Sequence, residues 1–241
     1  MSEEALIIGK NVDFTYTIKS GLGRNKLTKP IKGANFIINR GVKIGLIGAN
    51  GAGKSTFLKL LASIFEPTDG RIKRKAGLSC KLLSIASSLD MSLNGRDNAK
   101  LFLALERVNR NDRKELIELI KKTSDIGDFF EQPVKYYSTG MRARLSFAFC
   151  SLVATDVILI DELMGVGDAS FRTKATELMR RRINSGAAAV IASHQTDYLK
   201  AVADEIWVLN DGNLLTNMNK EDAVKYYLGY KNSVVSHTRL L

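Results

Sequence analysis

The sequence contains little of what would cross-link the chain or connect its parts through a linker. Of its 241 residues only 2 are cysteine and 3 are proline. Cys80 and Cys150 lie far apart in apolar stretches, and neither has a second cysteine or a histidine at metal-ligand spacing. We therefore expect two buried free thiols in a reducing compartment. Because proline is scarce and no low-complexity tract or internal repeat occurs, the sequence indicates no long linker.

Long hydrophobic runs and a surplus of acidic residues are also missing. No apolar run approaches the ~20 residues that a membrane-spanning helix needs. The first ten residues, MSEEALIIGK, lack the basic start and apolar core of a signal peptide. Lysine and arginine outnumber aspartate and glutamate by 36 to 25, which gives a formal charge of +11. That balance suits phosphate ligands, an anionic membrane surface or nucleic acid, and equally an ordinary solvated surface, because net charge does not select a partner.

The spacing of apolar residues predicts strands near both ends of the chain and helices between them. Strands are expected at 12–18, 34–39, 42–48, 157–161, 187–193 and 204–210, with a basic loop at 19–32 and a hairpin at 70–85. Helices are expected at 54–65, 95–108, 112–122, 124–130, 168–185 and 195–203, with a short one at 220–230. The alternation after residue 155 indicates βαβ units and a parallel sheet, and the helical stretch before it reads as an insert.

A phosphate-binding loop follows the apolar strand at 42–47. Residues 48–55, GANGAGKS, match the pattern G-x-x-x-x-G-K-[ST] in full. The glycines let successive backbone N–H groups point at phosphate oxygens, Lys54 adds charge at the β- and γ-phosphates, and Ser55 can bind Mg²⁺. Thr56 can face a phosphate with its N–H and hydroxyl. The predicted nucleotide-binding residues here are Gly48, Ala49, Asn50, Gly51, Ala52, Gly53, Lys54, Ser55 and Thr56.

Two adjacent acidic residues complete this chemistry. Asp161 closes the apolar strand VILID and can hold the Mg²⁺ shell together with Ser55. Glu162 comes next and can orient or deprotonate an attacking water. An acid pair after a strand is a weak signal alone, but a strong one in a chain that also carries the phosphate loop.

Residues 136–144, YYSTGMRAR, form a small-residue turn that leads into a helix. Ser138 and Thr139 are residue types that cap a helix N-terminus. The same turn presents backbone N–H groups and a helix dipole to an anion. Both interpretations are compatible with the residues.

The order of these motifs resembles that of the ATP-binding-cassette (ABC) ATPases over about residues 5–230. Residues 137–141 stand in the place of the family's signature motif, usually Leu-Ser-Gly-Gly-Gln. This resemblance implies that ATP is contacted by Ser138, Thr139, Gly140 and Asp168, the last in the family's D-loop. It also implies that Tyr16 stacks on adenine and that His194 is the switch histidine. The residues alone also allow Tyr16 as a core aromatic and His194 as a surface histidine.

The resemblance implies an α/β fold. It consists of a P-loop NTPase (ABC ATPase) core at about 5–85 and 155–230, an N-terminal antiparallel β subdomain, and an inserted α-helical subdomain at about 90–154. Residues 1–241 would then form a single nucleotide-binding domain.

Departures from the family pattern narrow the resemblance. Thr139 replaces the first signature glycine, Met141 replaces the glutamine, and Ser84 or Ile85 stands near the place of the Q-loop glutamine. With these features the chain looks like the ABC-2 type exporters of bacterial surface polysaccharides, namely O-antigen, capsule and teichoic acid. Some O-antigen members carry a C-terminal carbohydrate-binding domain. We expect none here, since the sequence ends about eleven residues after Tyr230, so glycan recognition would rest with the membrane partner.

The implied activity is ATP hydrolysis with Mg²⁺ between two copies arranged head to tail. Glu162 would act on the water and His194 on the γ-phosphate. The implied partner is a separate multi-spanning permease that handles a glycan-lipid. The chain would lie at the cytoplasmic face of the inner membrane, and no nucleic acid is expected.

Three alternatives compete with this hypothesis. An ABC ATPase for another substrate would usually keep the Q-loop glutamine and a regular signature. A soluble cassette protein acting on ribosomes or DNA generally has two cassettes or a long coiled coil. A P-loop kinase or GTPase is disfavoured by the adjacent Asp161 and Glu162 and by the absence of Asn-Lys-x-Asp.

Overall fold

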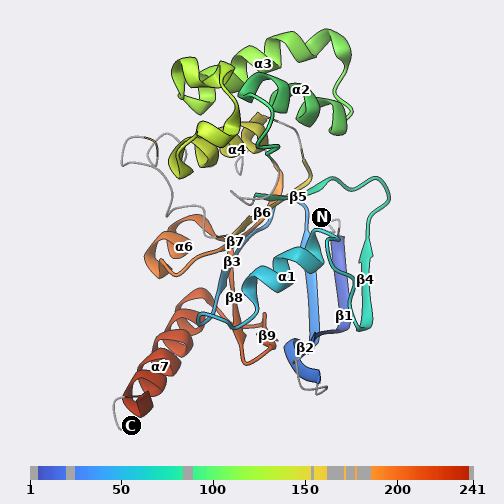
Figure 1. Cartoon of the computed structure of the whole chain (residues 1–241). Helices are drawn as coiled ribbons and strands as arrows, with labels where there is room; N and C mark the ends of the chain where they lie inside the picture. Colours follow the sequence, from blue (N-terminus) through green and yellow to red (C-terminus); the bar gives the residue numbers. More distant parts are fainter. Residues whose placement is uncertain are drawn as a thin grey trace. The chain divides into compact units, whose positions relative to one another are not determined.

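The computed structural model describes residues 5–19, 25–83, 89–152, 155–161, 171, 177 and 186–238. The chain divides into two compact units. We call the first the sheet unit; it consists of Met1–Leu82, Thr155–Glu162 and Gly186–Leu241. The second is the helical unit, which consists of Leu83–Ala154 and Leu163–Ser185. Figure 1 labels the elements of both.

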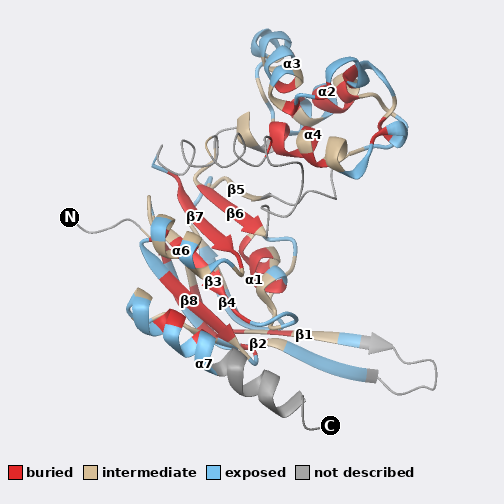
Figure 2. Cartoon of the chain, turned by 90° about the vertical axis from the view of Figure 1, so that its left-hand side faces the viewer, coloured by how far each residue is buried: buried red, intermediate tan, exposed pale blue. Residues whose placement is uncertain are grey.

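A six-stranded sheet forms the centre of the sheet unit, in the order β5-β6-β7-β3-β8-β9. Its strands are β3 (Lys43–Ile47), β5 (Cys80–Leu83), β6 (Val157–Asp161), β7 (Ala188–Ala192), β8 (Glu205–Asn210) and β9 (Asn213–Leu215). β6, β7, β3 and β8 run parallel to one another, and β9 returns antiparallel to β8. The central strands are buried, as Figure 2 shows. Continuous apolar runs suit strands covered on both faces, so this part of the prediction is confirmed.

Three helices of the sheet unit pack on these strands. α1 (Lys54–Leu61) contacts β6 and β7, α6 (Thr196–Val202) contacts β3, and α7 (Lys220–Thr238) contacts β8. α1 ends at Leu61 rather than at residue 65, and Ser63 just beyond it has a positive φ of 58°. The tail helix is confirmed and is longer than expected.

A three-stranded antiparallel sheet, in the order β2-β1-β4, also belongs to the sheet unit. Its strands are β1 (Ala5–Lys19), β2 (Asn25–Asn39) and β4 (Asp69–Arg74). The predicted loop at 19–32 is wrong from Asn25 onward, because those residues pair with β1. β2 is an edge strand, and its pairing with β1 has several register shifts. Proline is tolerated on an edge strand, so Pro30 is compatible with this pairing. Lysine is common on exposed edges, and positions 26–29 are exposed.

The predicted hairpin at 70–85 is also wrong. β4 pairs with β1, whereas β5 lies beside β6 at the edge of the other sheet. Backbone bonds place the start of β5, because Ser79 O accepts from the N–H groups of Asp156 and Val157 at 2.9 and 3.0 Å. The Asp156 carboxylate accepts in return from the N–H of Ser79 at 3.0 Å. Alternation predicts strands but does not say which strand each one pairs with.

The helical unit contains α2 (Gly95–Leu105), α3 (Arg110–Ser124) and α4 (Thr139–Leu152), with short 3₁₀ turns η1 (Gly127–Glu131) and η2 (Val134–Tyr136). The side chain of Asn94 caps α2 by accepting from the N–H of Asp97 at 2.7 Å. Buried Asn98 donates to the carbonyls of Asp90, Leu93 and Asn94, so the loop before α2 is anchored to the helix. Leu103, Ile120, Phe130, Leu145 and Phe149 are fully or almost fully buried and form its core.

No helix within the described part of the chain is both long and apolar enough to cross a bilayer. Cys80 is a partly buried free thiol that donates to Leu61 O at 3.5 Å, and burial raises the pKa of this thiol to about 12. The side chain of Cys150 lies outside the described residues.

Candidate nucleotide-binding site

The loop between β3 and α1 has a backbone that depends on glycine. Gly51 and Gly53 have positive φ angles of 79° and 104°. A Cβ at Gly53 would lie 2.6 Å from Pro30 O, and one at Gly48 would collide with Leu209 O. Residues with side chains would therefore distort this loop. With glycine at these positions, the backbone N–H groups stay accessible to a ligand.

The first turn of α1 is suited to an anion. Its N-cap residue, Gly53, has no side chain, no side-chain cap hydrogen bond is formed there, and its first turn contains no acidic residue. The first N–H groups of a helix have no partner within the helix, and the helix dipole adds partial positive charge at this end. Phosphate is the ligand that such a loop and helix start accept best.

The side chain of Lys54 folds over the loop. Its Nζ donates to Gly48 O at 2.7 Å and to Ala49 O at 3.0 Å. The ammonium group is thereby held beside the backbone cradle, where it can neutralise phosphate charge.

Three hydroxyl groups lie at or next to the start of α1. The Ser55 side chain is exposed, whereas that of Thr56 is buried. Thr56 Oγ1 is 3.1 Å from the hydroxyl oxygen of Tyr16 on β1, so the hydroxyl expected to face a phosphate also has a protein partner. The Tyr16 ring packs edge-on against Phe14 and Phe65, with centroid distances of 4.9 and 5.9 Å, and stays partly exposed. The β subdomain is thus connected directly to the phosphate-loop helix.

The carboxyl ends of β3, β6 and β7 lie along one edge of the six-stranded sheet. The register pairs Ala192 of β7 with Asp161 on one side and with Leu46 on the other. Asp161, which is partly exposed, therefore lies at the same height in the sheet as Leu46, two residues before Gly48 of the phosphate loop. Ligand sites of parallel α/β sheets form at this edge. Ser55 and Asp161 both offer oxygen donors, which are the donors that Mg²⁺ prefers.

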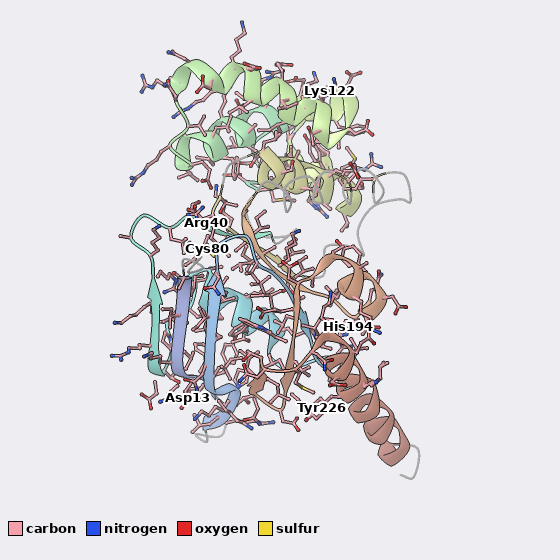
Figure 3. All side chains as sticks on the ribbon, turned by 180° about the vertical axis from the view of Figure 1, so that it is seen from behind. Asp13, Arg40, Cys80, Lys122, His194 and Tyr226 are labelled. Carbon is pink, nitrogen blue, oxygen red and sulfur yellow. The ribbon has the colours of Figure 1, made fainter. Side chains whose placement is uncertain are left out.

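His194 follows β7 at the same edge and is half-buried. The chain turn before it is fixed by buried Ser193, whose Oγ accepts from the N–H of Gln195 at 3.1 Å. His194 Nδ1 lies 3.4 Å from the hydroxyl oxygen of Tyr227 on α7. Figure 3 labels His194 and, on α7, the neighbouring Tyr226. No motif in the sequence marks Tyr227 as a site residue, although its spacing from Ala223 and Val224 is that of a buried helix face.

In the helical unit, residues 138–140 start α4. Ser138 Oγ accepts from the N–H of Met141 at 3.1 Å, which makes Ser138 the helix cap. Thr139 Oγ1 accepts from Arg142 Nη2 at 3.4 Å. A Cβ at Gly140 would meet only Ser138 Oγ, at an ordinary 3.8 Å, so the surrounding chain gives no steric reason for glycine here.

Tyr137 precedes this cap and is buried. Its hydroxyl donates to Phe129 O at 2.6 Å, and burial raises its pKa to about 12. The hydroxyl also fills the space beside Gly95, where a Cβ would lie 2.8 Å from it. Tyr137 therefore anchors the start of α4 to η1.

The predicted residues divide between the two units. Tyr16, residues 48–56, Asp161 and His194 belong to the sheet unit, and residues 138–140 belong to the helical unit. Glu162, Asp168, Ser84 and Ile85 lie outside the described residues.

Comparison with known proteins gives a consistent result. Residues 31–165 match the model of the ABC transporter family. The teichoic acids export ATP-binding protein TagH of Shouchella clausii is 33% identical over 202 residues, which are 84% of this chain and 56% of that protein. The capsule polysaccharide export ATP-binding protein CtrD of Neisseria meningitidis serogroup B is 35% identical over 194 residues, or 80% of this chain and 87% of that one.

The fold agrees with solved structures. A dimeric bacterial ABC transporter cassette matches with a TM-score of 0.73 and 22% identity, covering 89% of this chain and 100% of that one. The expected α/β P-loop fold with an antiparallel β sheet and a set of helices is confirmed. The family match extends over more than half of the chain and contains the whole phosphate loop. This chain is a member of the ABC transporter family, as an ATP-binding ATPase domain.

Proposed function

We propose that the chain is the ATP-hydrolysing subunit of an ABC transporter that exports a bacterial surface polysaccharide. The observation that carries the proposal is the phosphate loop at the shared edge of β3, β6 and β7, in a chain whose relatives are named for teichoic acid and capsule export. The altered signature residues Thr139 and Met141 favour this group of exporters over others.

Within the site, residues 48–56 bind the triphosphate and Lys54 neutralises its β- and γ-phosphates. Ser55 and Asp161 hold Mg²⁺, which when bound supplies charge neutralisation at the phosphoryl oxygens. Glu162 orients or deprotonates the attacking water, and His194 donates to the γ-phosphate. Tyr16 lies against adenine.

The complete site needs a second copy of the chain. In this proposal the α4 start of one copy, with Ser138, Thr139 and Gly140, faces the phosphate loop of the other, and Asp168 lies between the copies. The helix start adds backbone N–H groups and a dipole at the γ-phosphate. The open space at Gly140 supports this arrangement, because a bare backbone there allows close approach.

Closure on ATP and opening after hydrolysis would move a separate multi-spanning permease. The permease handles the glycan-lipid, and the chain lies peripherally at the cytoplasmic face of the inner membrane. No nucleic acid takes part.

The test is purification together with the permease encoded nearest to this chain. We expect the two to copurify, and the ATPase rate per subunit to rise in the complex and again when lipid-linked polysaccharide is added. Lys54→Ala is the control that assembles without hydrolysing ATP, and Glu162→Gln should accumulate as an ATP-bound dimer. Recovery of the chain on polysomes, with no membrane partner, contradicts the proposal.

A further inference from the structure

One buried side chain in contact with the site has no role in the function described so far. Tyr227 of α7 is only 4% exposed, and its hydroxyl oxygen lies 3.4 Å from His194 Nδ1. A distance of 3.4 Å is at the long end for a hydrogen bond, but catalytic hydrogen bonds often tighten when the substrate complex forms.

The chemistry of the imidazole gives this contact a direction. To donate to a γ-phosphate oxygen, a neutral His194 must carry its proton on Nε2. Nδ1 is then a hydrogen-bond acceptor, and the tyrosine hydroxyl is a group that can donate to it. A donor at Nδ1 stabilises the Nε2–H tautomer and also limits rotation of the ring.

Helix α7 is well placed to hold such a donor still. Buried Ala223 and Val224 pack the same face of α7, and the helix contacts β8. Two lysines connect its first turn to α6: Lys220 Nζ donates to Ala203 O at 3.0 Å, and Lys200 Nζ pairs with a Glu221 carboxylate oxygen at 3.0 Å. The helix that carries Tyr227 is therefore anchored to α6 at its first turn and to β8 along its buried face.

We propose that Tyr227 is a positioning residue for His194: its hydroxyl donates to Nδ1 and holds the imidazole in the Nε2–H tautomer, oriented toward the γ-phosphate. The inference rests on the proposed function of His194 in hydrolysis. It gives the C-terminal helix a direct part in turnover.

The first test compares two tyrosine-to-phenylalanine variants on the same helix. Tyr227→Phe removes only the donor, and we expect kcat to fall about threefold to tenfold with KM for ATP nearly unchanged, because the lost interaction acts in the transition state. Tyr226→Phe is the matched control, since the Tyr226 hydroxyl accepts from Asn210 Nδ2 at 3.3 Å and not from the site. Its kinetics should equal those of the unmodified chain.

A spectroscopic test has its deciding result in the unmodified chain. The chain has 2 histidines, so ¹⁵N-histidine labelling gives two rings, and His237→Gln assigns them. The spectra are recorded at about pH 8.5, two units above the ordinary histidine pKa, where an imidazole of ordinary pKa is neutral. We expect Nδ1 of His194 to show the shift of an unprotonated acceptor in a hydrogen bond, and to move toward the free value in Tyr227→Phe. A protonated Nδ1 in the unmodified chain overturns the proposal.

His194→Gln separates the two levels of the argument. If His194→Gln abolishes turnover while Tyr227→Phe has the kcat of Tyr226→Phe, the positioning role is wrong and the proposed function stands. If His194→Gln hydrolyses ATP at the unmodified rate, the role of His194 itself is wrong, and that of Tyr227 with it.

Discussion

Tyr137 shows how a departure from the family pattern is absorbed by packing. The family usually has leucine at this first signature position. Here the larger side chain is buried, and its hydroxyl reaches a backbone carbonyl of η1 at 2.6 Å. The space beside Gly95 makes room for it. The tyrosine at this position therefore belongs to the core of the helical unit.

Replacing Tyr137 with phenylalanine should lower the free energy of unfolding by about 1 kcal/mol, because the hydrogen bond of its buried side chain to Phe129 O is lost, while that carbonyl keeps the N–H of Gln132 as a donor. Urea unfolding measures the loss. Tyr136→Phe is the matched control, since Tyr136 is 64% exposed. Equal stability of the two variants would show that the Tyr137 hydroxyl bond contributes nothing.

Residue by residue, the candidate site was predictable where its chemistry is local. The phosphate loop, Asp161 and the cap at Ser138 each lie in a few consecutive residues, so motif and turn chemistry identify them. The Tyr16–Thr56 and His194–Tyr227 contacts join residues 40 and 33 positions apart. Nothing in either segment specifies such a pairing, because it arises only when the sheet brings distant segments together.

Among the elements, an ion-pair network joins α2, α3 and η1 on the surface of the helical unit. Arg96 pairs with Glu131 at 2.9 Å and with Glu118 at 2.8 Å, and Lys121 pairs with Glu131 at 3.1 Å. Hydrogen bonding from Arg96, followed by that from Lys121, lowers the pKa of Glu131 to about 2 from an ordinary 4.5. The network ties three elements whose apolar faces already share one core.

Because the folded-state pKa of Glu131 is depressed, its stabilising contribution is fully present above about pH 4.5 and is lost as the pH falls toward 2. We expect the NMR titration midpoint of the Glu131 carboxyl to lie near 2 and to move toward 4.5 in Arg96→Gln. Lys100→Gln, which breaks only the pair with Asp97 at 2.8 Å, should leave the midpoint unchanged. An ordinary midpoint in the unmodified chain would show that the network does not persist in solution.

At this scale the sequence predicted elements better than their partners. The buried strands β3, β6, β7 and β8 have continuous apolar runs and were located closely. The segments 19–32 and 70–85 were misassigned because edge strands tolerate proline and lysine, and because strand pairing depends on the whole sheet.

For the whole molecule, the proposed function requires an arrangement that no single copy of the chain can provide. In the proposed function, the phosphate loop of one copy and the α4 start of another form each ATP site. A closed pair with two-fold symmetry contains two such sites, and each copy contributes one half to each. Hydrolysis at a site then requires an intact phosphate loop from one copy and an intact α4 start from the other.

The most direct measurement mixes two inactive variants, Lys54→Ala in the phosphate loop and Ser138→Arg at the start of α4, at concentrations where the unmodified chain hydrolyses ATP. In a mixed pair one site carries both defects and the other carries none. The account predicts that each variant alone is inactive and that an equal mixture recovers up to about a quarter of the unmodified rate, from one intact site in half of the pairs. If the mixture stays as inactive as the separate variants, each ATP site lies within one chain and the central claim is wrong.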